Sequence, residues 1–186
     1  MKLPVFSRNH SPKKTFARGS IVSGLEKCIQ HDIPIQVHTG VGDAPVLDLR
    51  RANPLHLFAI LGDDYFRKGK IVLLHGGYPY LAEARSMVNM YPNLWVDLSE
   101  VIPFASIGLE RRLMELLEMA PTTKILYGSD CCYIPEIAWF SAIYFKRCLG
   151  KVLDGLVTDG LMAPDHAATT AAQILSENAR ELYKLS

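Results

Sequence analysis

The segment Ile71-Val-Leu-Leu-His-Gly-Gly77 decides the fold. Its four leading residues are all apolar, His75 ends the run, and two glycines then break it. An uninterrupted apolar run of this kind is typical of a strand buried on both faces, as in a parallel sheet covered by helices. Three further segments predict strands of the same kind, namely Ile33–His38, Leu94–Asp97 and Lys124–Tyr127.

Helical patterns alternate with these strands. The clearest is Leu109–Met119, which carries Leu113, Leu116 and Leu117 on one side and charged residues on the other. A helix precedes each strand and three helices follow the last one. This order indicates an α/β protein whose parallel sheet is either open and doubly wound or part of a closed barrel. The other predicted helices are Ile21–His31, Arg51–Leu61, Leu81–Met90, one beginning at Pro135, Pro164–Leu175, and Glu177–Leu185 with Ser176 as its N-cap.

The composition is that of a single globular domain. The chain has 186 residues, of which 49% are hydrophobic and 21% charged, and its formal net charge is +1. This balance argues against nucleic acid or an acidic membrane surface as the main partner. No apolar run in the sequence approaches the ~20 residues that a membrane-spanning helix needs.

The cysteines and the start of the chain bear on its compartment and its boundaries. No n-region followed by an apolar stretch opens the sequence, which disfavours secretion. Residues 1–18 are basic, contain no acid and show no periodicity, so we predict a poorly ordered start and one domain over residues 19–186. The cysteines lack zinc-finger spacing and are expected to be reduced thiols in a cytoplasmic protein; they are Cys28, Cys131, Cys132 and Cys148.

Three of the predicted strands end in a side chain that can bind a metal ion. His38, His75 and Asp130 stand at these ends, each with glycine close by. The C-terminal ends of parallel strands lie at one rim, in an open sheet as in a barrel. The three side chains are therefore expected to converge as one metal site. Asp97 ends the remaining strand, where a structural hydrogen bond is the simpler interpretation.

The predicted ligand set points to a first-row divalent ion. Two imidazoles and a carboxylate suit zinc first, with manganese, iron or nickel as alternatives. Such an ion can lower the pKa of its bound water to about 7 and so supply hydroxide. A carboxylate at the metal, here that of Asp130, can take the proton from that water.

Five motifs are specific as an ordered set. They are Ile35–Asp43, Leu74–Tyr80, Val96–Ser99, Ile125–Asp130 and Ile174–Tyr183. Together they resemble the amidohydrolase superfamily, and most strongly its amidohydrolase-2 group, in the branch found alone or fused to glutamine synthetase-like domains. The resemblance runs from about Gly19 to the C-terminus.

The resemblance implies a TIM-type (β/α)8 barrel. Residues 19–186 would be its C-terminal half, about strands five to eight with their covering helices. It also implies roles for the three side chains at the rim. His38 would bind the metal, His75 would bind the metal or contact the substrate and water, and Asp130 would bind the metal and act as general base. His75 and Asp130 are thus the predicted catalytic residues.

The sequence departs from the family pattern in one large respect. Family members carry a His-x-His pair on the first strand, and this sequence contains none. A whole barrel takes about 250 residues, so the first four strands are missing from these 186 residues. Half a barrel exposes two sheet edges that invite pairing with another chain. We therefore predict a partner, either a second copy in a homo-oligomer or a separate N-terminal half.

The resemblance implies an enzyme that hydrolyses a C–N or related bond in a small molecule. A metal-dependent decarboxylase is an alternative from the same group. Arg50, Arg51 and Arg85 are candidate contacts for its substrate carboxylate, although helix-surface roles are the simpler interpretation. A catalytically silent remnant that serves as a binding module is the alternative from another class, because the His-x-His pair is absent.

Overall fold

The structure is a computed structural model that describes residues 12–42, 47–131 and 133–185. Within them the chain forms a four-stranded sheet covered by helices. The strands are β1 (Ile35–His38), β2 (Ile71–Leu74), β3 (Leu94–Asp97) and β4 (Ile125–Leu126). The helices are α1 (Pro12–His31), α2 (Phe58–Leu61), α3 (Leu81–Met90), α4 (Val101–Phe104), α5 (Leu109–Leu117), α6 (Pro135–Thr158), α7 (Pro164–Ala172) and α8 (Asn178–Tyr183).

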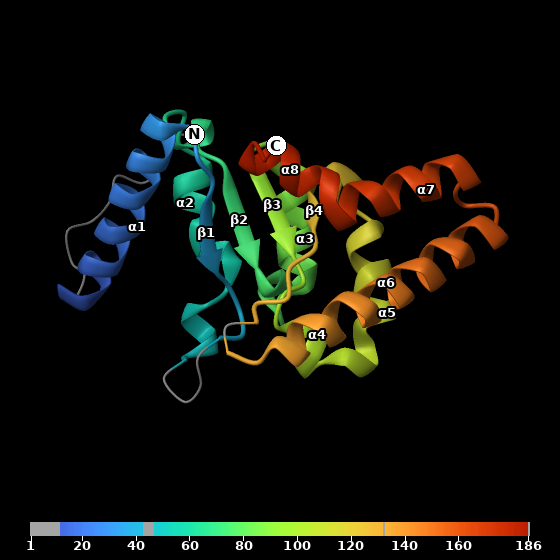
Figure 1. The fold of residues 1–186 in the computed structure, drawn as a ribbon. Helices are drawn as coiled ribbons and strands as arrows, with labels where there is room; N and C mark the ends of the chain where they lie inside the picture. Colours follow the sequence, from blue (N-terminus) through green and yellow to red (C-terminus); the bar gives the residue numbers. More distant parts are fainter. Residues whose placement is uncertain (1–11, 43–46, 132, 186) are drawn as a thin grey trace.

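The strands are all parallel and lie in the order β1-β2-β3-β4 (Figure 1). The register places Val37 beside Leu73, and Leu73 beside Val96. Spatial order therefore follows sequence order across the whole sheet. A doubly wound sheet reverses its strand order at a switch point, whereas a (β/α)8 barrel does not. The sheet is consequently a segment of the barrel type.

Alternate residues of the strands face the two sides of the sheet. Leu73 and Val96 belong to the main core, which includes residues of the covering helices. Val72 and Leu126 face the other side, where they pack with Leu182 of α8. Helix α8 lies at the end of the sheet where the strands begin (Figure 1). The C-terminal ends of the strands lie at the opposite end.

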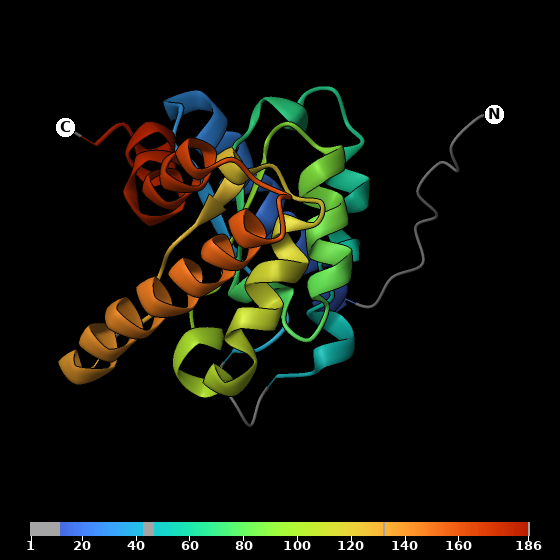
Figure 2. The same cartoon turned by 90° about the vertical axis from the view of Figure 1, so that its right-hand side faces the viewer.

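Different helices flank the two edges of the sheet. Helix α1 lies beside β1, and α6 and α7 extend beyond β4 (Figure 1). Helix α6 runs next to α5 (Figure 2). Its buried residues Phe145, Cys148, Leu149 and Val152 recur at helical spacing and join the main core.

The first helix begins earlier than the sequence pattern predicted. Helix α1 starts at Pro12 rather than near Ile21, and proline suits a first turn because its missing N–H has no helical partner there. The helix ends where Asp32 adopts a left-handed φ of 49°. Of the predicted poorly ordered start, residues 1–11 lie outside the described residues.

The predicted helix over residues 51–61 is broken into shorter turns. A 3-10 turn covers Pro54–Leu57 and only Phe58–Leu61 is α-helical. The cause lies at its start, because Pro54 has no N–H to continue a preceding turn. The side chain of Asn53 accepts a hydrogen bond from Leu55 N at 2.9 Å and so begins a new turn there.

The prediction that Ser176 caps the last helix is wrong. The chain passes from α7 to α8 through a π-helical turn over Gln173–Glu177, so no new helix start is needed. Ser176 lies inside this turn, and its hydroxyl donates a hydrogen bond to the Ala172 carbonyl at 3.4 Å. The hydroxyl therefore bonds backward along the helix instead of capping the next one.

Among the described cysteines, Cys28, Cys131 and Cys148 are free thiols. Cys132 lies outside the described residues. In the part of the chain that the structure describes, every helix is too short or too polar to cross a membrane.

Asp32 connects the end of α1 to the C-terminus. Its carboxylate accepts hydrogen bonds from Lys184 and, at 2.7 Å, from Lys70. These bonds, with that from Lys184 the larger effect, lower the pKa of Asp32 from 3.8 to about 2. Because the pKa of Asp32 is lower in the folded than in the unfolded chain, its ionised carboxylate stabilises the fold above pH 3.8. This stabilisation is lost as the pH falls towards about 2.

Replacement of Asp32 with asparagine is therefore expected to make the free energy of unfolding depend less on pH in the acid range. The effect at neutral pH should be small, because the ion pairs are exposed to solvent. Urea midpoints of the parent and Asp32→Asn, measured from pH 7 to pH 3, should differ most at pH 7 and converge on acidification. Parallel curves over this range would contradict the assignment.

Candidate metal centre

His75 follows β2 directly and lies at the centre of the C-terminal rim. Its side chain is fully buried. His75, Gly76 and Gly77 have positive φ angles of 63°, 60° and 64°, so the chain turns sharply at the strand end. Glycine adopts such angles freely, whereas at His75 they are strained. Strain of this kind concentrates at active sites and ligand-binding positions.

Ser99 and Asp97 fix the orientation of the His75 ring. Nδ1 of His75 lies 3.2 Å from the Ser99 carbonyl oxygen and 3.1 Å from Ser99 Oγ. A carbonyl only accepts, so Nδ1 carries the proton and Nε2 keeps its lone pair. The Ser99 hydroxyl in turn donates to Asp97 Oδ1 at 2.6 Å. The ring is thus held with Nε2 available as a ligand.

Asp97 is a buried acceptor that organises this rim. Its Oδ1 also accepts from the backbone N–H groups of His75 at 2.9 Å and Ser99 at 3.0 Å. Burial raises the pKa of the Asp97 carboxyl above its ordinary value, and these hydrogen bonds oppose the rise. The contacts agree with the structural role that the sequence pattern favoured for this strand terminus.

Three further polar groups surround Nε2 of His75. Nδ1 of His38 lies at 2.9 Å, Oδ2 of Asp130 at 3.7 Å and Oε2 of Glu100 at 3.8 Å. One ligand atom each from His75, Glu100 and Asp130 lies within 4.8 Å of the other two. Glu100 and Asp130 also share strained positive φ angles, 56° and 50°.

His38 reaches this group because two rim loops are bonded together. The N–H of Gly40 donates to the Ala52 carbonyl and that of Val41 to the Tyr78 carbonyl, both at 2.7 Å. The His38 and His75 ring centroids lie 4.7 Å apart. His38 is nevertheless exposed, which sets it apart from His75.

The donor set fits a divalent metal ion. Bond lengths of about 2.0–2.1 Å in tetrahedral zinc sites place neighbouring ligand atoms roughly 3.3 Å apart. Oδ2 of Asp130 and Oε2 of Glu100 lie near that value, at 3.7 and 3.8 Å from His75 Nε2, and the ligand atoms of these three residues lie within 4.8 Å of one another. His38 is not in that group, and its Nδ1 lies 2.9 Å from His75 Nε2. Imidazole nitrogens and carboxylate oxygens are also the ligand types that zinc prefers outside cysteine sites.

The structure places the three sequence-predicted ligands at one rim. His38 and His75 are in contact, and Asp130 lies beside His75. Sequence reasoning missed Glu100, because Asp97 already supplied the acid at the end of that strand and Glu100 follows three residues later. A signal was present in the run Asp97-Leu-Ser-Glu100, where a second acid follows the strand terminus. In the structure Glu100 has a positive φ of 56°, and its Oε2 lies 3.8 Å from His75 Nε2.

Two of the candidate carboxylate-binding arginines lie on the surface. Arg50 and Arg51 both pair with Asp48, and their side chains are 89% and 74% exposed. Both guanidinium groups form ion pairs with the Asp48 carboxylate. The helix-surface interpretation from the sequence is therefore the better one for both.

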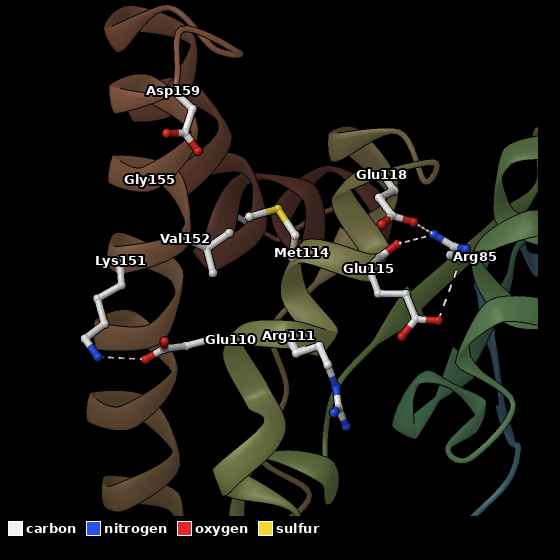
Figure 3. A pocket seen from close by; sticks show the side chains of 10 residues that line it. All are labelled: Arg85, Glu110, Arg111, Met114, Glu115, Glu118, Lys151, Val152, Gly155 and Asp159. Atoms are coloured by element: carbon white, nitrogen blue, oxygen red, sulfur yellow. Dashed lines mark hydrogen bonds and ion pairs between the residues drawn. The ribbon is translucent and has the colours of Figure 1, made fainter.

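The third arginine lines a groove between α3, α5 and α6 (Figure 3). Arg85 pairs with Glu118 and donates to the Glu115 carbonyl oxygen at 3.0 Å. Lys151 and Glu110 pair across the same groove at 2.9 Å. These ion pairs connect neighbouring helices, so Arg85 contributes to packing on the helical side of the sheet.

The fold and the rim together define a class of protein. Parallel strands in sequence order, with candidate metal ligands beyond their ends, make up roughly half of a (β/α)8 barrel of the amidohydrolase type. The sequence profile of the amidohydrolase family Amidohydro_2 matches residues 7–185. The chain belongs to this family.

Individual relatives agree with that assignment. Protein fluG from Emericella nidulans is 35% identical over 161 residues, which are 86% of this chain and 18% of fluG. An inferred metal-dependent hydrolase from Lactobacillus casei aligns with a TM-score of 0.81 and 30% identity, over 89% of this chain and 43% of that one. Uronate isomerase from Thermotoga maritima, at 15% identity and a TM-score of 0.62 over 89% of this chain and 40% of its own, is alike in fold alone. This chain spans less than half the length of each.

Proposed function

We propose that this chain carries part of the active site of a metal-dependent hydrolase that cleaves a C–N or related bond in a small molecule. The observation that carries the proposal is the convergence of His38, Glu100 and Asp130 on the Nε2 atom of a buried His75. Family membership supports the same reaction class. His38, His75 and Asp130 would hold the ion, zinc first, and Glu100 is a further candidate ligand.

Each residue has a defined task in this proposal. A zinc ion at the site would act as a Lewis acid and make water a better nucleophile at neutral pH. The Asp130 carboxylate would take the proton of the attacking water, since its Oδ2 lies at the rim only 3.7 Å from His75 Nε2. Ser99 and Asp97 keep the proton of His75 on Nδ1 throughout.

The candidate arginines give the decarboxylase alternative no specific support. Arg50 and Arg51 lie in the rim loop that follows β1, but both pair with Asp48. Arg85 pairs with Glu118 on the helical side of the sheet. The described ion pairs of all three are therefore with carboxylates of this chain.

Zinc binding is the direct test of the site. Calorimetric titration of the parent chain is expected to give one zinc per chain. His38→Ala and Asp130→Asn should each lower zinc affinity by at least about tenfold. Mutation of residues that only hydrogen-bond to metal ligands already lowers affinity by about this factor, and loss of a direct ligand should lower it more. Asp154→Asn is the matched control, since Asp154 is an exposed acid on α6. A parent chain that binds no zinc would favour the silent remnant.

The reaction class needs its own assay. Chromogenic anilides test hydrolysis of a C–N bond, and Asp130→Asn should reduce zinc-dependent cleavage by at least about 100-fold if its carboxylate is the general base. Release of CO2 from hydroxylated benzoates, without anilide cleavage, would overturn the hydrolase in favour of the decarboxylase.

The orientation of His75 by Ser99 leads to a further prediction. Ser99→Ala removes the hydroxyl that links His75 Nδ1 to Asp97. We expect zinc affinity to fall about 10- to 100-fold with the secondary structure intact, as for other contacts that orient a ligating histidine. Ser86→Ala is the control, because the Ser86 hydroxyl bonds only to the Ala82 carbonyl within α3 in the described contacts. Equal affinities of both variants would contradict the role of Ser99.

A further inference from the structure

Arg112 is a buried cation that the proposed reaction does not use. It lies in α5 and is only 8% exposed. Cζ of its guanidinium lies 4.6 Å from the centroid of the Tyr78 ring, and Nη1 donates to the Ala105 carbonyl at 2.9 Å. In the described contacts its charge therefore meets a ring face and a carbonyl oxygen rather than a carboxylate. Burial of a charge is costly, and these two contacts offset part of that cost.

Tyr78 connects Arg112 to the loop that begins with His75. The Tyr78 N–H donates to the His75 carbonyl at 2.9 Å. The Tyr78 carbonyl accepts a hydrogen bond from the N–H of Val41 at 2.7 Å, in the loop that follows His38. A shift of the Tyr78 ring would therefore disturb the backbone beside both histidines.

Ala105 connects Arg112 to the loop that contains Glu100. Helix α4 begins directly after Glu100 and ends at Ala105. The Ala105 N–H donates to the Val101 carbonyl at 3.0 Å, while the Ala105 carbonyl accepts from Arg112. The guanidinium thus lies between the loop that follows β2 and the loop that follows β3, and it contacts both.

We propose that Arg112 is a positioning residue: its guanidinium holds the loops that follow β2 and β3 together and so sets the spacing of the metal ligands that these loops carry. Those ligands are His75 and Glu100, whose Nε2 and Oε2 atoms lie 3.8 Å apart. The consequence for the metal rests on the proposed function, whereas the link between the loops does not. Arginine suits this task because its planar group can stack on a ring and donate along its edge at the same time, which lysine cannot do.

Gly108 offers an independent way to displace the guanidinium. It directly precedes α5 and has a φ of −98°, which residues with a Cβ also adopt. A Cβ at this position would lie 2.2 Å from Nη1 and 2.9 Å from Cζ of Arg112. These atoms form the end of a flexible side chain, so the guanidinium can move while the backbone stays in place. Gly108→Ala should therefore remove the contacts of Arg112 without removing the arginine.

Hydrogen exchange of backbone amides tests the link between the loops without any metal. Arg112→Met should speed exchange of the Tyr78 and Ala105 amides at least about tenfold, because the methionine side chain ends before the position of Cζ and the loops open more easily. Gly108→Ala should have the same effect. The double variant should exchange no faster than either single variant, since both changes remove the same contacts. Arg112→Lys, which keeps only the charge, should not restore the parent rates.

Two controls separate this role from a general loss of stability. Leu73 is fully buried in β2, so exchange of its amide reports on the whole fold. An equal rise at Leu73 and Tyr78 would overturn the proposal, as would additive effects in the double variant. Gly155→Ala is the matched glycine control, because a Cβ there meets nothing within 4 Å. This variant should leave the exchange rates of Tyr78 and Ala105 at their parent values.

Zinc affinity tests the consequence for the metal ligands. Arg112→Met and Gly108→Ala should each lower it about tenfold, as for other residues that orient ligands, and Gly155→Ala should not. The visible absorption bands of the cobalt(II)-loaded chain should shift in the first two variants, because these bands depend on ligand geometry. Faster exchange with unchanged zinc affinity and cobalt bands would overturn the positioning of the ligands. A parent chain that binds no zinc would refute the metal site and the ligand spacing together, while faster exchange at Tyr78 would still support the link between the loops.

Discussion

Replacement of Gly40 with alanine is expected to lower the free energy of unfolding by about 3 kcal/mol or more. Gly40 has a φ of 74°, which residues with a Cβ adopt only under strain. The added Cβ would also lie 2.1 Å from the Tyr78 carbonyl oxygen and 2.4 Å from the Gly77 carbonyl carbon. Both are backbone atoms, so no side-chain rotation relieves the clash. The loop after His38 must therefore move away from the loop that contains Gly77 and Tyr78.

Gly150→Ala is the control with the opposite expected sign. Gly150 lies inside α6, where a Cβ would meet nothing within 4 Å. Alanine there should raise the free energy of unfolding by about 0.5–1 kcal/mol, because glycine weakens a helix interior. Urea unfolding of the parent and both variants gives the two values. A Gly40→Ala protein as stable as the parent would show that the rim loops are arranged differently.

Replacement of His75 with asparagine is expected to weaken zinc binding by more than about 100-fold, beyond the loss seen for outer contacts of a metal site. Nε2 of His75 lies within 3.8 Å of ligand atoms from His38, Glu100 and Asp130, so its loss removes a contact with each of them. Asparagine tolerates the positive φ at this position, which limits the damage to the backbone. The asparagine side chain is shorter and cannot place a donor atom at the position of Nε2.

His166→Asn is the matched control, because His166 is exposed on α7. Zinc titration and thermal unfolding of the two variants separate loss of the ligand from loss of the fold. We expect His166→Asn to bind zinc like the parent, and His75→Asn to unfold cooperatively. Retained zinc affinity in His75→Asn would place the metal elsewhere and refute the proposed site.

The strands and the ligand positions at their ends could be predicted because both are local in sequence. Apolar runs such as Ile71–Leu74 are long enough to identify a buried strand, and β2 and β3 have the predicted apolar cores. Parallel pairing then carries the strand ends to one rim. This is why His38, His75 and Asp130 could be grouped before any distance was known. The same reasoning gave a wrong prediction for residues 51–61, which were expected to form one helix. Asn53 and Pro54 begin a new 3-10 turn there instead.

The remainder of the site depends on contacts between distant segments. The role of Ser99 follows from its 3.1 Å approach to His75, a residue 24 positions away. Glu100 joins the site through its backbone angle, which no side-chain pattern encodes. The exposure of Trp139 on α6 likewise follows only from which helix face the core covers.

The sequence by itself determined the family, the parallel α/β class and the three polar strand ends, because periodicity and residue type are properties of short segments. Tertiary structure alone decided that Glu100 lies with them and that Ser99 and Asp97 orient His75. The reason is physical: these positions are set by distances between segments that lie tens of residues apart.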